Sequence, residues 1–108
     1  MKIVIIGAGA VGYDLARNLS SSDHVVTLVE RDLAVLEHAQ ESLDCRFVQA
    51  NGVSPRALDQ LGMADCDLFA AVTEKDETNI IACLTAAQLG AGKTVARVRD
   101  EDYYLGHS

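Results

Sequence analysis

The chain has 108 residues, of which 49% are apolar and 23% are charged, and its formal net charge is −7. This length allows one hydrophobic core without a second lobe, and the apolar content argues against disorder. The acidic surface repels phosphate backbones, so general nucleic-acid binding is disfavoured.

Neither the cysteines nor the histidines show the spacing of a metal site. The cysteines are odd in number and lack a Cys-x-x-Cys pair, so we expect reduced thiols that pack as small apolar residues. They are Cys45, Cys66 and Cys83, and the histidines are His24, His38 and His107. The sequence therefore predicts no metal site, and its apolar runs are too short to span a bilayer.

Short apolar runs alternate with helical patterns along the chain. Five nearly continuous apolar runs are predicted as strands, at residues 2–6, 25–29, 46–49, 68–72 and 94–98. Such runs are typical of strands buried on both faces of a parallel sheet. The alternation predicts an α/β fold, a Rossmann-like doubly wound parallel sheet in the order 3-2-1-4-5 with helices on both faces.

Four helices are predicted between the strands, at residues 10–19, 32–43, 55–61 and 76–89. We expect Asp32 and Ser54 to cap the second and third helices, Pro55 to occupy a first helical position, and Gly62 and Gly90 to end helices. Apolar periodicity predicts these inward-facing residues: Val11, Leu15 and Leu19; Leu33, Leu36 and Leu43; and Ile80, Cys83, Leu84 and Ala87.

A glycine-rich stretch, GAGAVG, follows the first predicted strand and opens the first predicted helix. This is the context that a Gly-x-Gly-x-x-Gly dinucleotide motif requires. Gly7 is expected to permit the tight turn, Gly9 to let backbone approach a pyrophosphate, and Gly12 to let the helix pack on the strand. The helix N-terminus adds N–H donors for phosphates. The candidate binding residues are Gly7, Ala8, Gly9, Ala10, Val11 and Gly12.

An acidic residue is expected at the end of the second strand, about 20 residues beyond the turn. Glu30 fits this position, and its carboxylate can accept hydrogen bonds from both hydroxyls of an adenosine ribose. The same charge disfavours the 2′-phosphate of NADP, whereas the neighbouring Arg31 argues the other way. These features do not distinguish NAD from ATP, ADP or AMP, because all of them share adenosine and phosphate.

Other candidate residues follow the third and fourth strands, at the edge where ligands sit in open α/β sheets. Asn51 either donates to an adenine edge or forms an ordinary Asn-Gly turn, and Gly52 is expected to adopt an unusual backbone angle. The Thr73 hydroxyl is placed to touch a ligand. Asp76 and Glu77 begin the next helix, where their charge favours its dipole.

Two arginines, Arg97 and Arg99, are expected on one face of the fifth strand. Paired arginines on a buried strand need an acid, a phosphate or a partner subunit. An ion pair with Asp or Glu is the simplest alternative, and Arg99 remains a candidate ligand contact.

Three longer stretches carry a family resemblance that covers essentially the whole chain: IIGAGAVGYDLARNLS, FVQANGVSPRALDQLGMADCDLFAAVT and DETNIIACLTAAQLGAGKTVARVRDEDY. With them the sequence resembles the N-terminal nucleotide-binding domains of Trk potassium-uptake regulators, the TrkA N-terminal domains of the RCK/KTN family. The second and third stretches are more diagnostic than the glycine turn, because dehydrogenases do not usually show AVTxxDETN followed by ARVRxxDY.

The resemblance implies a regulatory protein, not an enzyme, with no catalytic residues. Members form cytoplasmic rings or homo-oligomers at the inner face of the membrane, beneath a potassium transporter or channel. They bind NAD(H), our first expectation here, or ATP and ADP, and the ligand shifts the conformation that the membrane partner feels. The resemblance assigns the phosphate turn to Gly7, Gly9 and Gly12, the ribose acid to Glu30, and cleft-edge positions to Asn51 and Thr73.

Two alternatives stay open. One is the nucleotide-sensing domain of a potassium channel or efflux antiporter, which differs only in the membrane partner. The other is the cofactor domain of an NAD-dependent dehydrogenase, which needs a substrate lobe and a positioned acid or base. We expect residues 1–108 to form one domain that is a fragment of a longer protein.

Overall fold

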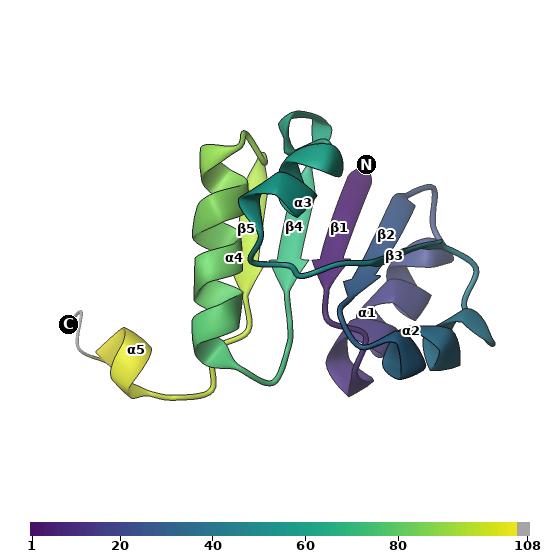
Figure 1. Ribbon diagram of the computed structural model, residues 1–108, viewed down its shortest axis with the longest axis horizontal. Helices are drawn as coiled ribbons and strands as arrows, with labels where there is room; N and C mark the ends of the chain where they lie inside the picture. Colours follow the sequence, from purple (N-terminus) through teal and green to yellow (C-terminus); the bar gives the residue numbers. More distant parts are fainter. Residues whose placement is uncertain (106–108) are drawn as a thin grey trace.

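Five parallel strands form one sheet, in the order β3-β2-β1-β4-β5, in the computed structural model, which describes residues 1–105. This order confirms the prediction. The strands are β1 (Lys2–Ile6), β2 (Val25–Glu30), β3 (Arg46–Gln49), β4 (Leu68–Ala71) and β5 (Lys93–Ala96). In the central strand, Ile3 pairs with Val26 of β2 and with Leu68 of β4. The carboxyl ends of all the strands lie along one edge of the sheet (Figure 1).

The helices also lie close to their predicted positions. They are α1 (Ala10–Ser20), α2 (Leu33–Gln40), α3 (Pro55–Gln60), α4 (Asp76–Gln88) and the short α5 (Asp102–Leu105). Both expected caps are confirmed, because Asp32 accepts the N–H of Ala34 and Ser54 accepts the N–H of Ala57. A 3₁₀ turn, η1 (Met63–Asp65), was not predicted, since three residues show no periodicity.

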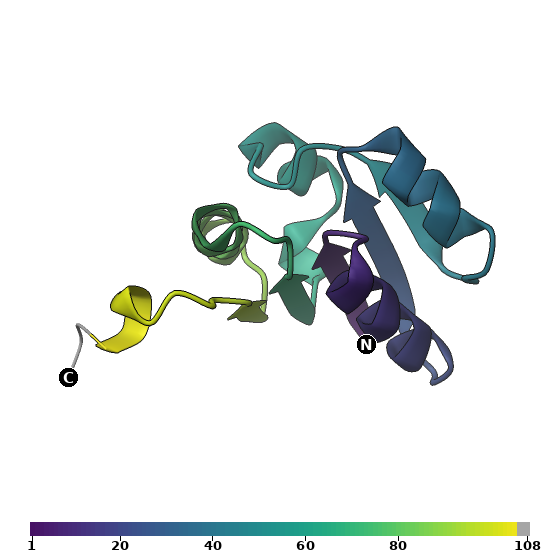
Figure 2. The same cartoon turned by 90° about the horizontal axis from the view of Figure 1, so that it is seen from below.

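The sheet separates two hydrophobic clusters. On one face, Ile3 and Ile5 of β1 pack with Ala16 of α1 and Ala39 of α2. The other face carries a cluster in which α3, η1 and α4 pack on the sheet through Leu58, Met63, Ala82, Cys83 and Ala86. Figure 2 shows α1 and α4 on opposite faces of the sheet and α5 lying apart from it, beyond α4. Helices therefore cover both faces, as the doubly wound fold requires.

The predicted inner stripe of α1 is only partly correct, because Leu15 and Leu19 pack against the core but Val11 does not. The buried residues of α1 are Gly12 and Ala16, whereas Val11 is 39% exposed and Leu15 and Leu19 are only half-buried. The large apolar residues recur at helical spacing, but the residues through which this helix contacts the sheet are the small Gly12 and Ala16. The leucines instead cover the margin of the contact.

The same error occurs in α2 and α4. Leu36 and Leu43 are buried, yet Leu33 is 49% exposed. In α4 the buried Cys83 was predicted correctly and Ile80 is half-buried, but Leu84 is 61% exposed and Ala87 is also exposed. The residues that face the sheet beside Cys83 are the small Ala82 and Ala86 and the polar Asp76 and Asn79.

The cysteines and the possible metal ligands are distributed over several elements of the fold. Cys66 and Cys83 are buried and Cys45 is half-buried, all three are free, and burial raises the pKa of each thiol. Across residues 1–105, the His, Cys, Asp and Glu side chains form no group of three that could hold a metal ion, and His107 lies outside the described residues. No helix in that range combines the length and apolar content needed to cross a membrane.

Candidate functional site

The glycine turn links the central strand to the first helix. Gly7 has φ +105°, a conformation that side-chain-bearing residues rarely adopt, and its N–H donates to the Val29 carbonyl at 2.8 Å. Gly9 is the N-cap of α1 and provides no side-chain cap. The first N–H groups of α1 therefore face the carboxyl edge of the sheet without a side-chain acceptor, as an anion site needs.

Each of the three motif glycines faces a different environment. A Cβ on Gly12 would lie 1.7 Å from the Gly7 carbonyl oxygen, and one on Gly7 would lie 3.1 Å from the backbone nitrogen of Thr73. A Cβ on Gly9 would meet nothing within 4 Å. Gly7 and Gly12 are thus required by the protein's own packing, as predicted. Gly9 leaves open space in front of the turn, which fits a pyrophosphate there.

Glu30 is built into the turn. Its Oε1 accepts the N–H of Ala8 at 2.9 Å, and its Oε2 accepts the N–H of Asp32 at 2.9 Å. The half-buried carboxylate is therefore held beside the phosphate turn, at the position that the motif gives to the ribose acid. Each oxygen keeps capacity for a further donor, so the geometry fits two ribose hydroxyls.

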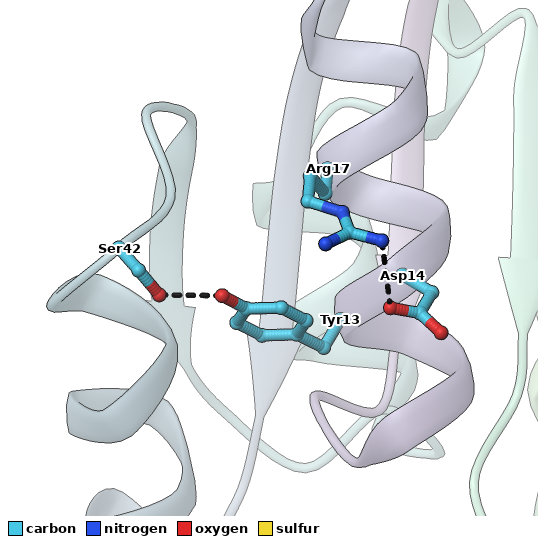
Figure 3. Close-up of polar contacts among 4 residues, drawn as sticks. All are labelled: Tyr13, Asp14, Arg17 and Ser42. Carbon is cyan, nitrogen blue, oxygen red and sulfur yellow. Dashed lines mark hydrogen bonds and ion pairs between the residues drawn. The ribbon is translucent and has the colours of Figure 1, made fainter.

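A cleft of about 540 Å³ opens next to the turn, between α1 and α2. Its lining is mostly apolar and consists of Ala8, Gly9, Ala10, Tyr13, Asp14, Ala34, Val35 and His38. The rings of Tyr13 and His38 have centroids 6.3 Å apart, and the Tyr13 hydroxyl bonds Ser42 at 2.5 Å (Figure 3). The sequence analysis did not predict that Tyr13 and His38 line a cleft, although Tyr13 directly follows the last motif glycine.

Asp14, which lines this cleft, forms an ion pair with Arg17 on α1, as Figure 3 shows. The paired atoms are 3.4 Å apart, but both side chains are more than 60% exposed. Solvent screening leaves such a pair little effect on stability.

The loop after β3 corrects one prediction. Gly52 is not among the residues with positive φ, so the expected unusual backbone angle is absent. Glycine is needed there for space, because a Cβ would lie 2.3 Å from Cγ2 of the buried Ile6. Asn51 forms the ordinary turn, since its Oδ1 accepts the N–H of Val53 at 3.1 Å. Its side-chain amide nitrogen stays a candidate adenine contact.

Thr73, after β4, touches the back of the glycine turn and is held by Asn79. The Asn79 Oδ1 accepts both the backbone N–H and the hydroxyl of Thr73, at 2.9 and 2.7 Å. The Thr73 hydroxyl oxygen in turn accepts the N–H of Lys75 at 3.2 Å. Asn79 was not singled out from the sequence, because a polar residue at a helical position normally faces solvent.

Asp76 has a role that the helix-dipole interpretation missed. The N-cap of α4 is Lys75, without a side-chain cap, and Asp76 lies in the first turn, 8% exposed. Its two oxygens accept the N–H groups of Arg99 at 3.0 Å and Asp100 at 2.8 Å. These two hydrogen bonds, and then the charges of Arg99 and Arg97, lower the pKa of Asp76 despite partial burial.

The arginine prediction was also inaccurate, because β5 ends at Ala96 and both residues follow the strand. Arg97 is half-buried and donates weakly to the Thr73 carbonyl at 3.5 Å. Arg99 is exposed and donates to the Glu74 carbonyl at 2.5 Å. Within residues 1–105 neither guanidinium has a carboxylate within ion-pair distance. The expected ion pair is therefore absent from the described structure.

The fold gathers most of the sequence-predicted candidates at one edge. The strand order places Asn51 and Gly52, then Glu30 and Arg31, the glycine turn, Thr73 and finally Arg99 along the carboxyl ends of the five strands. Arg31 is exposed, and its carbonyl accepts from the Gln49 side chain at 3.3 Å. The predicted residues therefore share one edge, with Thr73 in contact with the turn and Arg99 furthest from Glu30 in the strand order.

The sheet order, the glycine turn and the hydrogen bond between Glu30 and that turn together define a Rossmann-like domain. The chain belongs to the TrkA-N domain family, whose sequence profile matches residues 3–105. A curated relative from Haemophilus influenzae, "Trk system potassium uptake protein TrkA", is 45% identical over 104 residues. That alignment covers 95% of this chain and 23% of the relative.

An archaeal relative shows the same pattern. The "Trk system potassium uptake protein TrkA homolog" of Methanothermobacter thermautotrophicus is 34% identical over 103 residues, which are 95% of this chain and 48% of the relative. The chain thus spans about a quarter to a half of these curated relatives. Both relatives are named for potassium uptake.

Solved structures support the fold independently. The TrkA-N domain of inner membrane protein ybaL from Escherichia coli superposes with a TM-score of 0.64 at 15% identity, covering 98% of this chain and 94% of that chain. A putative short-chain dehydrogenase/reductase family oxidoreductase from Aeromonas hydrophila gives 0.64 at 20% identity, covering 81% and 51%. A TrkA-N domain and a putative dehydrogenase/reductase share this architecture, so the fold alone does not decide the activity.

Proposed function

We propose that this domain binds an adenine nucleotide at the glycine turn and Glu30, and that occupancy regulates a Trk-type potassium uptake system. NAD(H) is the expected ligand, with ATP and ADP as alternatives. The observation that carries the proposal is the hydrogen bond from Ala8 N–H to Glu30 Oε1, because it sets a ribose acceptor directly beside the phosphate turn.

The parts of the site suit different parts of such a ligand. The uncapped N-terminus of α1 and the open space at Gly9 favour a pyrophosphate over the turn. Glu30 favours free ribose hydroxyls and repels a 2′-phosphate, so NADP(H) is expected to bind poorly. Asn51 and Arg31 are proposed to contact the adenosine side, and Thr73 and Arg99 the opposite side of the phosphates.

A regulatory function is favoured over an enzymatic one. The curated relatives are named for potassium uptake, whereas the dehydrogenase likeness comes from fold similarity at 20% identity. We propose that the longer protein forms a cytoplasmic homo-oligomer on the inner face of the membrane, against a Trk-type transporter subunit. The ligand would regulate transport through its different affinities for two conformations of that assembly.

A second candidate partner is a potassium channel or efflux antiporter. The TrkA-N domain of an inner membrane protein gives this alternative its support. The nucleotide site would be the same and only the membrane partner would differ. Co-purification of the longer protein with a Trk-type subunit would favour the first partner.

Calorimetric titration of the folded domain with NADH, NAD, ATP, ADP and NADPH tests the binding proposal. We expect heat of binding from at least one of the first four ligands, and much weaker binding of NADPH than of NADH. If none of the four binds to a folded sample, nucleotide binding is wrong. Tight NADPH binding would contradict the role given to Glu30.

A further inference from the structure

Asn79 is a buried polar side chain whose hydrogen-bonding groups are all engaged. It is 0% exposed, and its Oδ1 accepts the N–H and the hydroxyl of Thr73. Its Nδ2 donates to the Thr73 carbonyl at 3.0 Å and to the Arg97 carbonyl at 2.8 Å. A buried amide held by four bonds is fixed in orientation, because any displacement leaves a polar group without a partner. One side chain thus ties the end of β4 to the end of β5.

Thr73 connects this amide to the candidate ligand site. A Cβ on Gly7 would lie 3.1 Å from both Cγ2 and the backbone nitrogen of Thr73. The turn and Thr73 therefore lie in close contact, on the side of the turn that faces β4. The contact between the turn and Thr73, followed by the hydrogen bonds between Thr73 and Asn79, gives a continuous path from the turn to Asn79.

Beyond Ala96 the chain leaves the sheet and is held mainly by the start of α4. Arg97 N–H still donates to the Ala71 carbonyl at 2.9 Å, but the next attachments are the N–H groups of Arg99 and Asp100 on Asp76. The Tyr103 hydroxyl then donates to the Glu77 carboxylate at 2.6 Å. Figure 1 shows this segment passing the first turn of α4 on its way to α5. We call residues 97–103 the exit segment.

We propose that Asn79 is a positioning residue that couples occupancy of the glycine turn to the attachment of the exit segment. The inference rests on the proposed nucleotide binding and adds to it the route by which occupancy reaches the chain beyond the sheet. Because coupling is reciprocal, a ligand that fixes Thr73 stabilises the exit segment, and release of the exit segment weakens the ligand by the same factor.

The test is amide hydrogen exchange of Arg99 and Asp100, with and without saturating NADH, in the wild-type chain and in Asn79→Asp. The aspartate carboxylate can still accept the N–H and the hydroxyl of Thr73, but it loses both donor bonds, to the Thr73 and Arg97 carbonyls. In the wild type we expect NADH to slow exchange at these two amides by about fivefold or more. In Asn79→Asp the ratio of bound to free exchange rates rises towards one while NADH still binds.

A merely structural role of Asn79 predicts a different result. It would speed exchange equally in the free and bound states, leaving the ratio unchanged, and that outcome would overturn the inference. Thr85→Val is the matched control, because it removes a side-chain bond within α4, to the Ile81 carbonyl, without touching the exit segment. The control should keep the wild-type ratio.

Calorimetry on the same samples separates this inference from the proposed function. If the wild type binds NADH but Arg99 and Asp100 gain no protection, the coupling is wrong and nucleotide binding stands. If no adenine nucleotide binds, the proposed function fails and the coupling fails with it. If Asn79→Asp does not fold, the bound and free exchange rates are compared in Asp76→Asn instead. This substitution weakens the hydrogen bonds that Asp76 accepts from Arg99 and Asp100. An unchanged ratio in Asp76→Asn would equally contradict the coupling.

Discussion

The Glu30 carboxylate, at the end of β2, is bonded to the backbone N–H of Ala8 inside the turn that follows β1. The acid thus belongs to the structure of the turn as well as to the proposed ribose site. Since its second oxygen accepts the N–H of Asp32, it also joins the turn to the start of α2. Replacing Glu30 therefore affects the order of both loops and the contact to the ligand.

Glu30→Ala should weaken the binding of NADH or the preferred nucleotide by about 1–3 kcal/mol, because charge-assisted hydrogen bonds to the ribose are lost. Calorimetric titration measures the change. The matched control is Glu37→Ala, which removes an exposed glutamate from α2 and should leave affinity unchanged. An unaltered affinity in Glu30→Ala would remove this residue from the site.

The glycine turn offers a second test in which two similar substitutions should act differently. Gly12→Ala places a Cβ 1.7 Å from the Gly7 carbonyl oxygen, and we expect it to lower the free energy of unfolding by about 3 kcal/mol or more. Gly9→Ala meets no neighbouring atom, so it should fold normally. Its methyl group would occupy the space proposed for the pyrophosphate.

Urea unfolding and calorimetry together separate the two variants. Gly9→Ala should keep the wild-type unfolding midpoint and lose at least about tenfold in nucleotide affinity, a change of 1.4 kcal/mol. Normal nucleotide affinity in Gly9→Ala would show that the phosphates do not lie over this glycine. A stable Gly12→Ala would contradict the close contact between α1 and the turn.

Sequence patterns were sufficient for the turn, which depends on local signals, and for the sheet order, which follows from the usual topology of strands and helices that alternate around such a turn. Continuous apolar runs identify buried strands, and a glycine motif between a strand and a helix has one common structural meaning. Glu30 could be placed for the same reason, since its distance along the chain from the turn is part of the motif.

Contacts between segments distant in sequence could not be predicted in the same way. Asn79 and Asp76 bind backbone groups of residues 97, 99 and 100, and backbone groups carry no sequence signal. The exposed Leu84 was misplaced because the helical period does not tell whether a sheet accepts leucine or alanine at a given depth. Gly52 was predicted to adopt an unusual backbone angle, but glycine is needed there because the Ile6 side chain leaves no room for a Cβ.

Asp76 should make the attachment of the exit segment sensitive to acid. Its pKa is lowered in the folded state, so its contribution to stability is present above the ordinary carboxyl pKa, near 3.8, and is lost as the pH falls through the lower folded value. Hydrogen exchange of Arg99 and Asp100 should therefore lose protection below about pH 4, relative to amides in β1.

Asp76→Asn provides the comparison, because its side chain does not titrate. Its Arg99 and Asp100 amides should be less protected than those of the wild type at neutral pH, and the difference should shrink in acid. Asp67→Asn is the control for the loss of one charge, since that carboxylate accepts the Lys2 N–H at the opposite edge of the sheet. A constant difference between wild type and Asp76→Asn at all pH values would contradict the role of the Asp76 charge.

Tyr103 should report the attachment of α5 to α4 at alkaline pH. Its hydrogen bond to the Glu77 carboxylate, aided by burial and the nearby acidic charges, raises the pKa of the Tyr103 hydroxyl to about 12. Because the folded value lies above the unfolded one, near 10, the stabilisation is complete below pH 10 and is lost as the pH rises towards 12.

The difference in tyrosinate absorbance between the wild type and Tyr103→Phe isolates the titration of Tyr103. In Glu77→Gln, which keeps an acceptor but removes the charge, the titration should move back towards its ordinary value. Titration of Tyr103 near pH 10 in the wild type would show that its hydroxyl does not hold α5 against α4 in solution.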